Sequence, residues 1–308
     1  MKENEHVTLP DGRKLGFAEY GDPQGIPVLF FHGWPSSRFQ AAYLDHDASK
    51  RGIRLLAPDR PGVGLSDPMP DRRFGDWPKD VGQFADSLGI DRFRIFGVSG
   101  GGPYTLATCE KLGDRVIRAA VICGAPPLAD KADRSHMHWA YRTLSGLKSL
   151  RRASLPVLLP FSRWMIDRGV DHAPMSWMLK SIPEADREAI HSAGGWDMVI
   201  RSYLEAIRNG PGPTLDDGEL YLAPWDFEPE RIHVPVHFWH GMADANLPCD
   251  VAKRLAARVP KAEGTWLEGE GHYSLPVRHS CEALDWLKGS GQENAHAGVS
   301  NMTGSSAS

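Results

Sequence analysis

The sequence predicts an α/β protein in which a mostly parallel central sheet is flanked by helices. Short apolar runs of strand length alternate with helix-like patterns along the chain, and repeated strand, loop and helix units are typical of such a sheet. Several of the predicted strands end in loops rich in glycine, proline and polar residues. Ligands of these sheets bind beyond the carboxyl ends of the strands, so we expect the functional site there.

Residues 1–127 are predicted to form the first part of the core. Residues 7–20 alternate in polarity around Pro10-Asp11-Gly12-Arg13, a signal for two antiparallel strands joined by a tight turn. Later patterns predict strands at 27–31, 53–58, 93–96 and 116–123, and helices at 77–88 and 104–109. In the loops after the strands, we expect His32 to be structural and Asp59 and Asp67 to accept hydrogen bonds from nearby backbone N–H groups.

Residues 128–226 are predicted to form a helical insertion over the site. The pattern becomes helical, is broken by prolines and glycines, and carries several large apolar side chains, among them Trp139, Trp164, Trp177, Trp196 and Trp225. Tryptophan and methionine side chains can line an apolar pocket, although we expect most of them to pack within the insertion itself.

Residues 227–290 are predicted to form the second part of the core. Apolar runs at 234–239 and 264–268 indicate strands, and the patterns at 250–258 and 278–287 indicate helices. Residues 291–308 contain almost no large apolar side chain, which predicts a disordered tail.

Composition argues against several classes of protein. The 308 residues carry a formal net charge of −4, and the densest basic cluster, residues 148–152, is small, so nucleic acid is not an expected partner. The polar N-terminus does not resemble a signal peptide, and no apolar run approaches the roughly 18 residues of a membrane-spanning helix. We therefore expect a cytoplasmic protein without a membrane partner. Four cysteines without C-x-x-C spacing favour reduced thiols over disulfides or zinc.

The pattern Gly97-x-Ser99-x-Gly101 lies between an apolar run and a helix pattern, which predicts a strand, a sharp turn and a helix. This turn forces its central residue toward positive φ, and the close approach of the chain leaves no room for side chains two residues away. A dinucleotide-binding loop would require a second glycine where Ser99 stands. The pattern therefore favours a serine nucleophile at the carboxyl edge of the sheet.

A serine hydroxyl needs a base within hydrogen-bond reach, and a carboxylate holds that base in one tautomer. Asp244 follows a later predicted strand and His272 follows the last one, so the chain has the order Ser99, Asp244, His272. Other histidines near these loops are expected to be structural or exposed: His237, His240 and His279. We expect Glu270 to be a surface residue.

The sequence resembles the α/β-hydrolase-fold superfamily, in particular serine hydrolases with a helical cap, over residues 7–287. The resemblance is carried by five motifs in order: His32-Gly33-Trp34-Pro35, residues 59–66 (DRPGVGLS), Gly97-Val98-Ser99-Gly100-Gly101, residues 240–244 (HGMAD) and Gly271-His272. It implies that Ser99 is the nucleophile, His272 the general base and Asp244 its carboxylate partner. It also implies an oxyanion hole made by the backbone N–H groups of Trp34 and Gly100.

The resemblance implies acyl chemistry, because related epoxide hydrolases and haloalkane dehalogenases have aspartate where this chain has Ser99. We expect a carboxylic ester hydrolase that acts on a small to medium, fairly apolar ester or lactone and requires no metal or organic cofactor. Aminopeptidases, carbon–carbon bond hydrolases and perhydrolases share the pattern, and a binding protein of the same fold remains an alternative. The oligomeric state is left open.

An aminopeptidase would need acidic side chains for the ammonium group of its substrate. Two clusters in the insertion offer such side chains: Glu184, Asp186 and Glu188, and Asp216, Asp217 and Glu219. We expect both clusters to be solvated helix faces.

Overall fold

The computed structural model describes residues 1–135, 137, 142, 161–169, 171–173, 175–192 and 195–289. The strands are β1 (Lys2–Thr8), β2 (Lys14–Gly21), β3 (Ile26–Phe31), β4 (Ile53–Pro58), β5 (Phe93–Val98), β6 (Val116–Ile122), β7 (Val236–Gly241) and β8 (Ala262–Leu267). The α-helices are α1 (Asp45–Lys50), α2 (Trp77–Ser87), α3 (Gly101–Lys111), α6 (Met175–Leu179), α7 (Glu184–His191), α8 (Gly195–Ala206), α9 (Gly212–Tyr221), α10 (Cys249–Ala256) and α11 (Ser274–Lys288). The 3₁₀ helices are η1 (Arg38–Leu44), η2 (Phe74–Asp76) and η3 (Pro229–Arg231).

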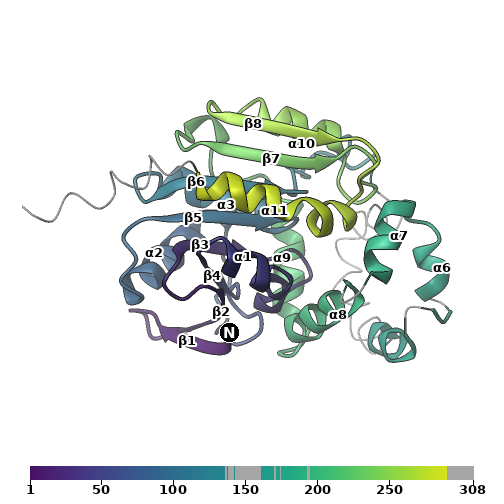
Figure 1. Ribbon diagram of the computed structural model, residues 1–308, viewed down its shortest axis with the longest axis horizontal. Coiled ribbons are helices and arrows are strands. Elements are labelled where there is room, and N and C mark those ends of the chain that lie inside the picture. The colour runs from purple at the N-terminus through teal and green to yellow at the C-terminus, as the bar shows by residue number, and fades with distance from the viewer. Residues whose placement is uncertain are drawn as a thin grey trace, which may run out of the picture.

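Within these residues one 8-stranded sheet has the order β1-β2-β4-β3-β5-β6-β7-β8 (Figure 1). The β1–β2 and β2–β4 pairs are antiparallel, and every pair from β4 to β8 is parallel. The predicted α/β class and the mostly parallel sheet are therefore confirmed. Because β3 to β8 run in the same direction, the loops that follow them meet at one edge of the sheet.

Side chains of the central strands alternate between two cores, as the two-residue period of a strand requires. In β3, Leu29 and Phe31 belong to the cluster that includes Phe84 of α2 and Leu106 of α3. Val28 and Phe30 belong to the opposite cluster, with Leu284 of α11. Both faces of the sheet are thus covered by helices, which explains why these strands are apolar throughout.

The predicted insertion places α6, α7, α8 and α9 between β6 and β7 in the chain. Figure 1 shows α6, α7 and α8 together at one end of the sheet, whereas α9 lies against the core. Tyr221 of α9 is buried in the same apolar cluster as Phe74 and Trp77. The domain boundaries proposed from the sequence, 128 and 226, remain a prediction, and α9 packs as part of the core although it falls within them.

The insertion tryptophans differ in their surroundings. Trp196 packs against a small apolar cluster of the insertion, and Trp225 packs against the main core. Trp164 and Trp177 are exposed. Trp139, the basic cluster at 148–152 and the predicted tail at 291–308 lie outside the described residues.

Several helical segments differ from the sequence prediction, two of them near the sheet and the site. The chain between β3 and β4 forms η1 and α1, which the pattern did not indicate. Helix α11 begins at Ser274 rather than near residue 278, and its first N–H groups find an acceptor on α7, described below. The early start of α11 depends on these contacts with α7, which a local sequence pattern does not reveal.

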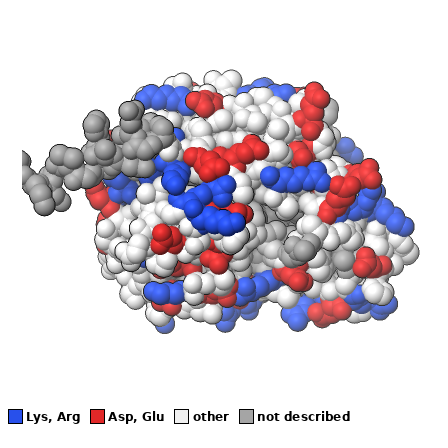
Figure 2. Space-filling view, viewed as in Figure 1, with Lys and Arg blue, Asp and Glu red and all other residues white. Residues whose placement is uncertain are grey.

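The described part of the chain contains no helix with the length and apolar character needed to span a membrane. On the face shown in Figure 2, acidic and basic side chains are interspersed rather than gathered in one large basic area.

Candidate active site

Ser99 lies at the apex of a sharp turn between β5 and α3, with φ of 52°. The flanking glycines are required by close packing. A Cβ at Gly97 would overlap Thr105 Oγ1, and a Cβ at Gly101 would overlap the carbonyl oxygen of Phe31. The strained turn predicted from the sequence is therefore present, and it places the Ser99 hydroxyl beyond the carboxyl end of β5.

Three side chains from three strand ends form one chain of hydrogen bonds. The Ser99 Oγ lies 2.9 Å from His272 Nε2, and His272 Nδ1 lies 2.8 Å from Asp244 Oδ2. Asp244 follows β7 and His272 follows β8. The structure thus brings together all three side chains that the sequence pattern singled out, with the hydroxyl within hydrogen-bond distance of the imidazole and the imidazole within hydrogen-bond distance of the carboxylate.

Asp244 is buried and held by its own loop. Its Oδ1 accepts hydrogen bonds from the backbone N–H groups of Asn246 (2.8 Å) and Leu247 (2.9 Å), which leaves Oδ2 for His272. Burial alone raises the pKa of the Asp244 carboxyl, but the charge and hydrogen bond of His272 outweigh burial, so the pKa lies below its usual value. Asp244 therefore stays ionised beside the imidazole.

His272 has a side chain that is only 11% exposed. Burial lowers the pKa of its imidazole, but the Asp244 charge and hydrogen bond, followed by the charge of Asp186, outweigh burial and raise the pKa above the ordinary value. Its neighbour His240 is buried, with Nε2 lying 3.0 Å from the carbonyl oxygen of Leu247 and 3.4 Å from Asp244 Oδ2. His240 is thus a structural residue of the Asp244 loop, as predicted.

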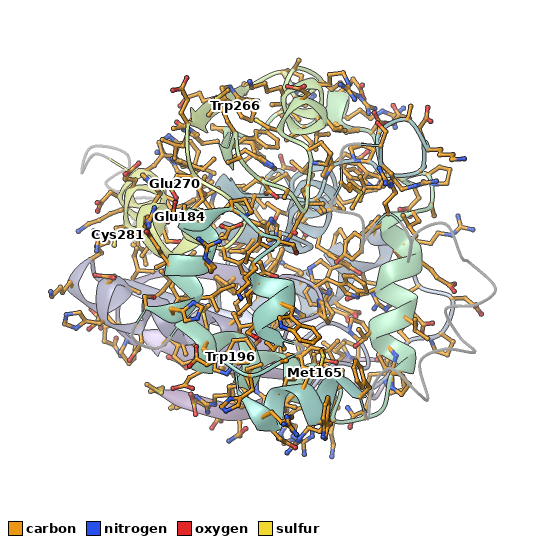
Figure 3. The ribbon with its side chains drawn as sticks, turned by 90° about the vertical axis from the view of Figure 1, so that its right-hand side faces the viewer. Met165, Glu184, Trp196, Trp266, Glu270 and Cys281 are labelled. Atoms are coloured by element: carbon orange, nitrogen blue, oxygen red, sulfur yellow. The ribbon has the colours of Figure 1, made fainter. Side chains whose placement is uncertain are left out.

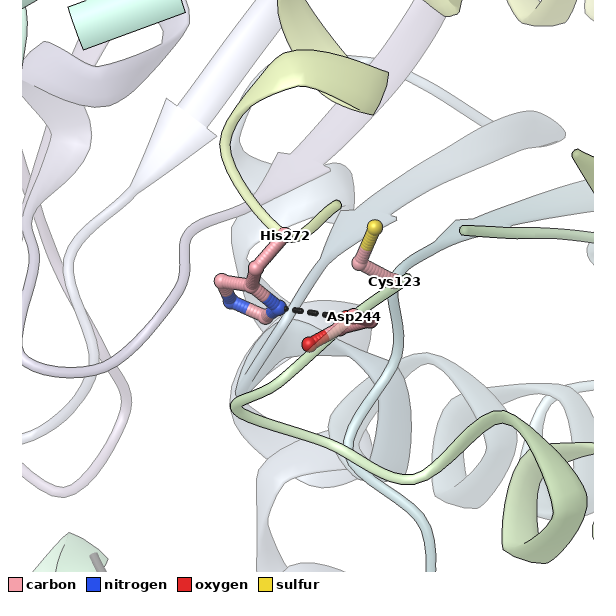
Figure 4. Close-up of side chains that lie close together, drawn as sticks. All are labelled: Cys123, Asp244 and His272. Carbon is pink, nitrogen blue, oxygen red and sulfur yellow. Dashed lines mark hydrogen bonds and ion pairs between the residues drawn. The ribbon is translucent and has the colours of Figure 1, made fainter. Parts of the chain in front are cut away.

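Cys123 is a site neighbour that sequence reasoning did not identify (Figure 4). It follows β6 with φ of 47° and is buried. Its Sγ and the nearest ligand atoms of Asp244 and His272 all lie within 4.8 Å of one another. Burial raises the pKa of the Cys123 thiol well above its ordinary value, and Asp244 and His272 are hydrogen-bonded to each other. A protonated thiol beside the pair accounts for this cluster without a metal ion.

The predicted oxyanion donors, Trp34 and Gly100, lie side by side next to Ser99. A Cβ at Gly100 would lie 2.8 Å from Trp34 Cβ, and a Cβ at Gly33 would lie 3.3 Å from Ser99 Cβ. Neither the Trp34 N–H nor the Gly100 N–H donates a hydrogen bond to another group in the described part of the chain. Two unpaired N–H groups beside a nucleophile can stabilise a developing negative charge.

Helix α9 forms hydrogen bonds with both Trp34 and Gly100. The Trp34 indole Nε1 donates to the carbonyl oxygen of Thr214 at 2.6 Å, and the Tyr221 hydroxyl donates to the carbonyl oxygen of Gly100 at 2.9 Å. The insertion therefore reaches the loop after β3 and the turn after β5 with separate hydrogen bonds.

A buried network of charged side chains contacts the loop that carries Trp34. Arg60 donates through Nη1 and Nη2 to the carbonyl oxygens of His32 (2.5 Å) and Gly33 (2.6 Å). The Asp217 carboxylate of α9 pairs with both Arg60 and Arg72, and it also accepts a hydrogen bond from Tyr104. Burial raises the pKa of the Asp217 carboxyl, but the two guanidinium charges outweigh it and hold the pKa well below its usual range.

Other strand-end residues are structural, as predicted. His32 is fully buried, and burial followed by the Arg60 charge lowers the pKa of its imidazole well below the ordinary value. Asp59 accepts hydrogen bonds from the N–H groups of Arg38 (2.7 Å) and Leu65 (3.1 Å). Asp67 accepts one from the N–H of Lys14 at 2.8 Å. These side chains therefore stabilise the loops around the site, and their hydrogen bonds go to groups other than Ser99 and His272.

The predictions for the acidic residues need correction. Asp186 and Asp217, both expected on solvated helix faces, are buried, with 2% and 1% of their surfaces exposed. Each carboxylate has partners distant in sequence, which a helix pattern cannot reveal. Glu270, expected on the surface, has a side chain only 13% exposed and pairs with Arg278 and His279.

Comparison with known proteins identifies the family. The model of the alpha/beta hydrolase fold matches residues 26–156. A bifunctional esterase/perhydrolase from Acinetobacter calcoaceticus is 34% identical over 266 residues, covering 83% of this chain and 88% of that protein. The chain therefore belongs to the α/β-hydrolase fold family, as the motifs predicted.

Solved structures of the same fold include a bromoperoxidase from Bacillus anthracis and an esterase from Exiguobacterium antarcticum. The bromoperoxidase has a TM-score of 0.69 at 20% identity and covers 92% of this chain and 99% of its own. The esterase has a TM-score of 0.67 at 19% identity and covers 94% of this chain and 100% of its own. These two likenesses establish the fold.

Proposed function

We propose that this protein is a serine hydrolase that cleaves a small to medium, fairly apolar carboxylic ester or lactone. The observation that carries the proposal is the continuous hydrogen-bonded chain from Ser99 through His272 to Asp244, with Ser99 at a sharp turn directly after β5. The family membership and the esterase/perhydrolase relative support the same reaction class.

In the first half of the proposed reaction, Ser99 Oγ attacks the acyl carbon of the ester while His272 Nε2 takes the hydroxyl proton. The carbonyl oxygen becomes an oxyanion, which the N–H groups of Trp34 and Gly100 would stabilise. Collapse of this intermediate breaks the bond to the alcohol oxygen, and His272 returns the proton to that oxygen. The products are a free alcohol and an acyl group bound to Ser99.

In the second half, water replaces the alcohol. His272 Nε2 removes a proton from the water as its oxygen attacks the acyl carbon, and the same donors stabilise the second oxyanion. The bond to Ser99 Oγ then breaks, and the serine recovers its proton from His272. Asp244 remains ionised throughout and stabilises the imidazolium form of His272.

The apolar character of the substrate is inferred from the insertion. Met175, Leu179 and Ile190 form a buried cluster that packs against Tyr273, the residue directly after His272. Apolar packing next to the residue that follows the base favours an uncharged acyl or alcohol group over a charged one.

Perhydrolysis is a second candidate activity, because the relative from Acinetobacter calcoaceticus is named as both an esterase and a perhydrolase. Hydrogen peroxide would attack the same acyl group in place of water and release a peroxycarboxylic acid, with no change in the roles of Ser99 and His272. Incubation with a short-chain ester and hydrogen peroxide, followed by peroxyacid detection, separates this activity from hydrolysis alone.

An aminopeptidase activity has less support from the insertion. The carboxylate of Asp217 is neutralised by two arginines, and that of Asp186 accepts three backbone hydrogen bonds. Glu184 and Glu188 have exposed side chains that pair with Arg187 and Arg278. Neither of the buried carboxylates is therefore available to bind the ammonium group of a peptide.

The test is a panel of aryl esters, lactones, amides and peptides, measured with the wild type and the Ser99→Ala variant. We expect turnover of short-chain aryl esters that is lost in Ser99→Ala, with unchanged circular dichroism. Covalent labelling by a fluorophosphonate, lost in His272→Ala, reports an activated serine. A wild type that neither turns over the panel nor reacts with the probe would instead support the binding-protein alternative.

A further inference from the structure

Asp186 of α7 holds the backbone of the His272 loop. Its Oδ2 accepts a hydrogen bond from the His272 N–H at 3.0 Å, and its Oδ1 accepts from the N–H groups of Tyr273 (2.8 Å) and Ser274 (2.9 Å). Tyr273 and Ser274 lie at the start of α11, where backbone N–H groups have no partner within the helix, and His272 directly precedes them. One carboxylate from the insertion therefore accepts from three consecutive N–H groups.

The fit around this carboxylate is close. A Cβ at Gly271 would overlap the Asp186 carboxylate, so the residue before His272 must be glycine for the contact to form. Figure 3 views the end of the molecule that carries the insertion and labels Glu184 of α7 and Glu270 of the loop before His272. Arg278 of α11 pairs with both Glu188 of α7 and Glu270. The first turns of α7 thus dock onto this loop.

The His272 imidazole is surrounded by groups from several elements. Asp244 contacts its Nδ1 from the loop after β7, and Ser99 contacts its Nε2 from the turn after β5. His240 at the end of β7 and the Cys123 thiol after β6 lie around the same pair. Asp186 adds a second negative charge from α7, and this charge favours the imidazolium form.

We propose that Asp186 is a positioning residue for His272, holding the loop that carries the base through three backbone hydrogen bonds. Its buried negative charge lies close enough to the imidazole to favour the protonated ring. The inference rests on the proposed function, in which His272 is the base. It assigns to α7 a direct influence on the reaction, because α7 supplies the carboxylate that holds the loop carrying the base.

The experiment compares Asp186→Asn, Asp186→Ala and the control Glu188→Gln. Asparagine keeps one acceptor oxygen but removes the charge, whereas alanine removes both. Glu188 is on the same helix, and its exposed carboxylate pairs with Arg278, so Glu188→Gln makes the same change of charge at a solvated position where screening is strong.

We expect the acid limb of kcat/KM for an aryl ester to move to lower pH in Asp186→Asn, because loss of the negative charge lowers the pKa of His272. In Asp186→Ala, kcat should also fall by up to about 100-fold, since ~1 Å displacements of a catalytic group have effects of that size. Glu188→Gln should follow the wild-type profile.

An NMR titration of the His272 ring separates this inference from the proposed function, because it needs no substrate. The His272 midpoint should lie lower in Asp186→Asn than in the wild type and in Glu188→Gln. Equal midpoints in all three proteins would overturn the role of Asp186, whether or not esters are hydrolysed. A shifted midpoint in a protein without esterase activity would instead overturn the proposed function alone. If Asp186→Ala does not fold, the titration of Asp186→Asn still tests whether Asp186 raises the His272 midpoint.

Discussion

Asp217 of α9 and Arg60 of the loop after β4 form a buried ion pair, with 2.7 Å between Asp217 Oδ2 and Arg60 Nε. The same guanidinium donates to the carbonyl oxygens of His32 and Gly33, directly before Trp34. The insertion is thereby joined to the loop that carries one proposed oxyanion donor. The arrangement fixes the loop by charge as well as by packing.

Replacement of Asp217 by asparagine should destabilise the protein by about 3–5 kcal/mol, because it leaves the buried charges of Arg60 and Arg72 without a counter-charge. Urea unfolding monitored by tryptophan fluorescence measures this change. The neighbouring Asp216 is exposed, and Asp216→Asn should change the free energy of unfolding by no more than about 0.5 kcal/mol. Equal stability of the two variants would contradict the structural role of the pair.

Alanine at Gly100 should lower kcat by about 10²- to 10³-fold, the usual effect of losing an oxyanion donor. Its Cβ would lie 2.5 Å from the Tyr221 hydroxyl and 2.8 Å from Trp34 Cβ, so both proposed donors would be displaced. Steady-state kinetics with an aryl ester should show the loss in kcat rather than in KM.

Gly212→Ala is the matched control for this change, because a Cβ at Gly212 meets no atom within 4 Å. The double variant Gly100→Ala/Tyr221→Phe should remain impaired, since the contact with Trp34 persists. Full activity in Gly100→Ala would argue against the Gly100 N–H as a donor.

Ser99→Gly should be inactive but more stable than Ser99→Ala by about 1 kcal/mol. Ser99 has φ of 52°, a region that costs an L-residue with a Cβ roughly 1–2 kcal/mol and that glycine adopts freely. Thermal and urea unfolding of the two inactive variants provide the comparison. If Ser99→Ala were the more stable of the two, the turn would not be strained in solution.

The sequence was sufficient to place the proposed nucleophile, base and acid because each follows a strand of one parallel sheet. A strand pattern is local, and the shared edge is a property of the fold class, so the sequence alone predicts that Ser99, Asp244 and His272 lie close together. The resemblance to serine hydrolases, rather than the strand pattern, indicated that the Trp34 and Gly100 N–H groups lie close together.

Asp186 and Asp217 could not be placed in this way. Both lie in polar helical stretches that look solvated, and their burial depends on partners far along the chain: 157 positions separate Asp217 from Arg60, and 86 separate Asp186 from His272. Only tertiary packing decides which acidic residue of such a helix faces the core. Cys123 was missed for a related reason, since an apolar strand end gives no sign that its last side chain lies beside Asp244 and His272.

The pH dependence of ester hydrolysis should follow His272. The base must be neutral to accept the Ser99 proton, and the Asp244 and Asp186 carboxylates raise its pKa against the effect of burial. The acid limb of kcat/KM should therefore have its midpoint above ~6.5, the ordinary histidine value, with activity lost as pH falls through that midpoint. Rate measurements between pH 5 and 9 test this, and a flat profile would argue against His272 as the base.

A carboxylate placed at Cys123, directly after β6, should restore part of the activity that is lost when Asp244, after β7, is replaced by asparagine. Asp244→Asn is expected to lower kcat by about 10⁴-fold, the effect of losing the carboxylate partner of a catalytic histidine. The Sγ of Cys123 lies within 4.8 Å of the nearest Asp244 and His272 atoms, so Cys123→Asp places a new carboxylate beside the same imidazole. Aspartate also tolerates the φ of 47° at this position better than most residues.

The double variant Cys123→Asp/Asp244→Asn should have a kcat at least about tenfold higher than that of Asp244→Asn. The reason is that a negative charge again stabilises the imidazolium. Cys123→Asn/Asp244→Asn is the matched control, since it has nearly the same shape without the charge, and it should recover nothing. Fluorophosphonate labelling rates give the same comparison without a chosen substrate. Equal rates for the two double variants would mean that Asp244 acts through the geometry of its loop rather than through its charge.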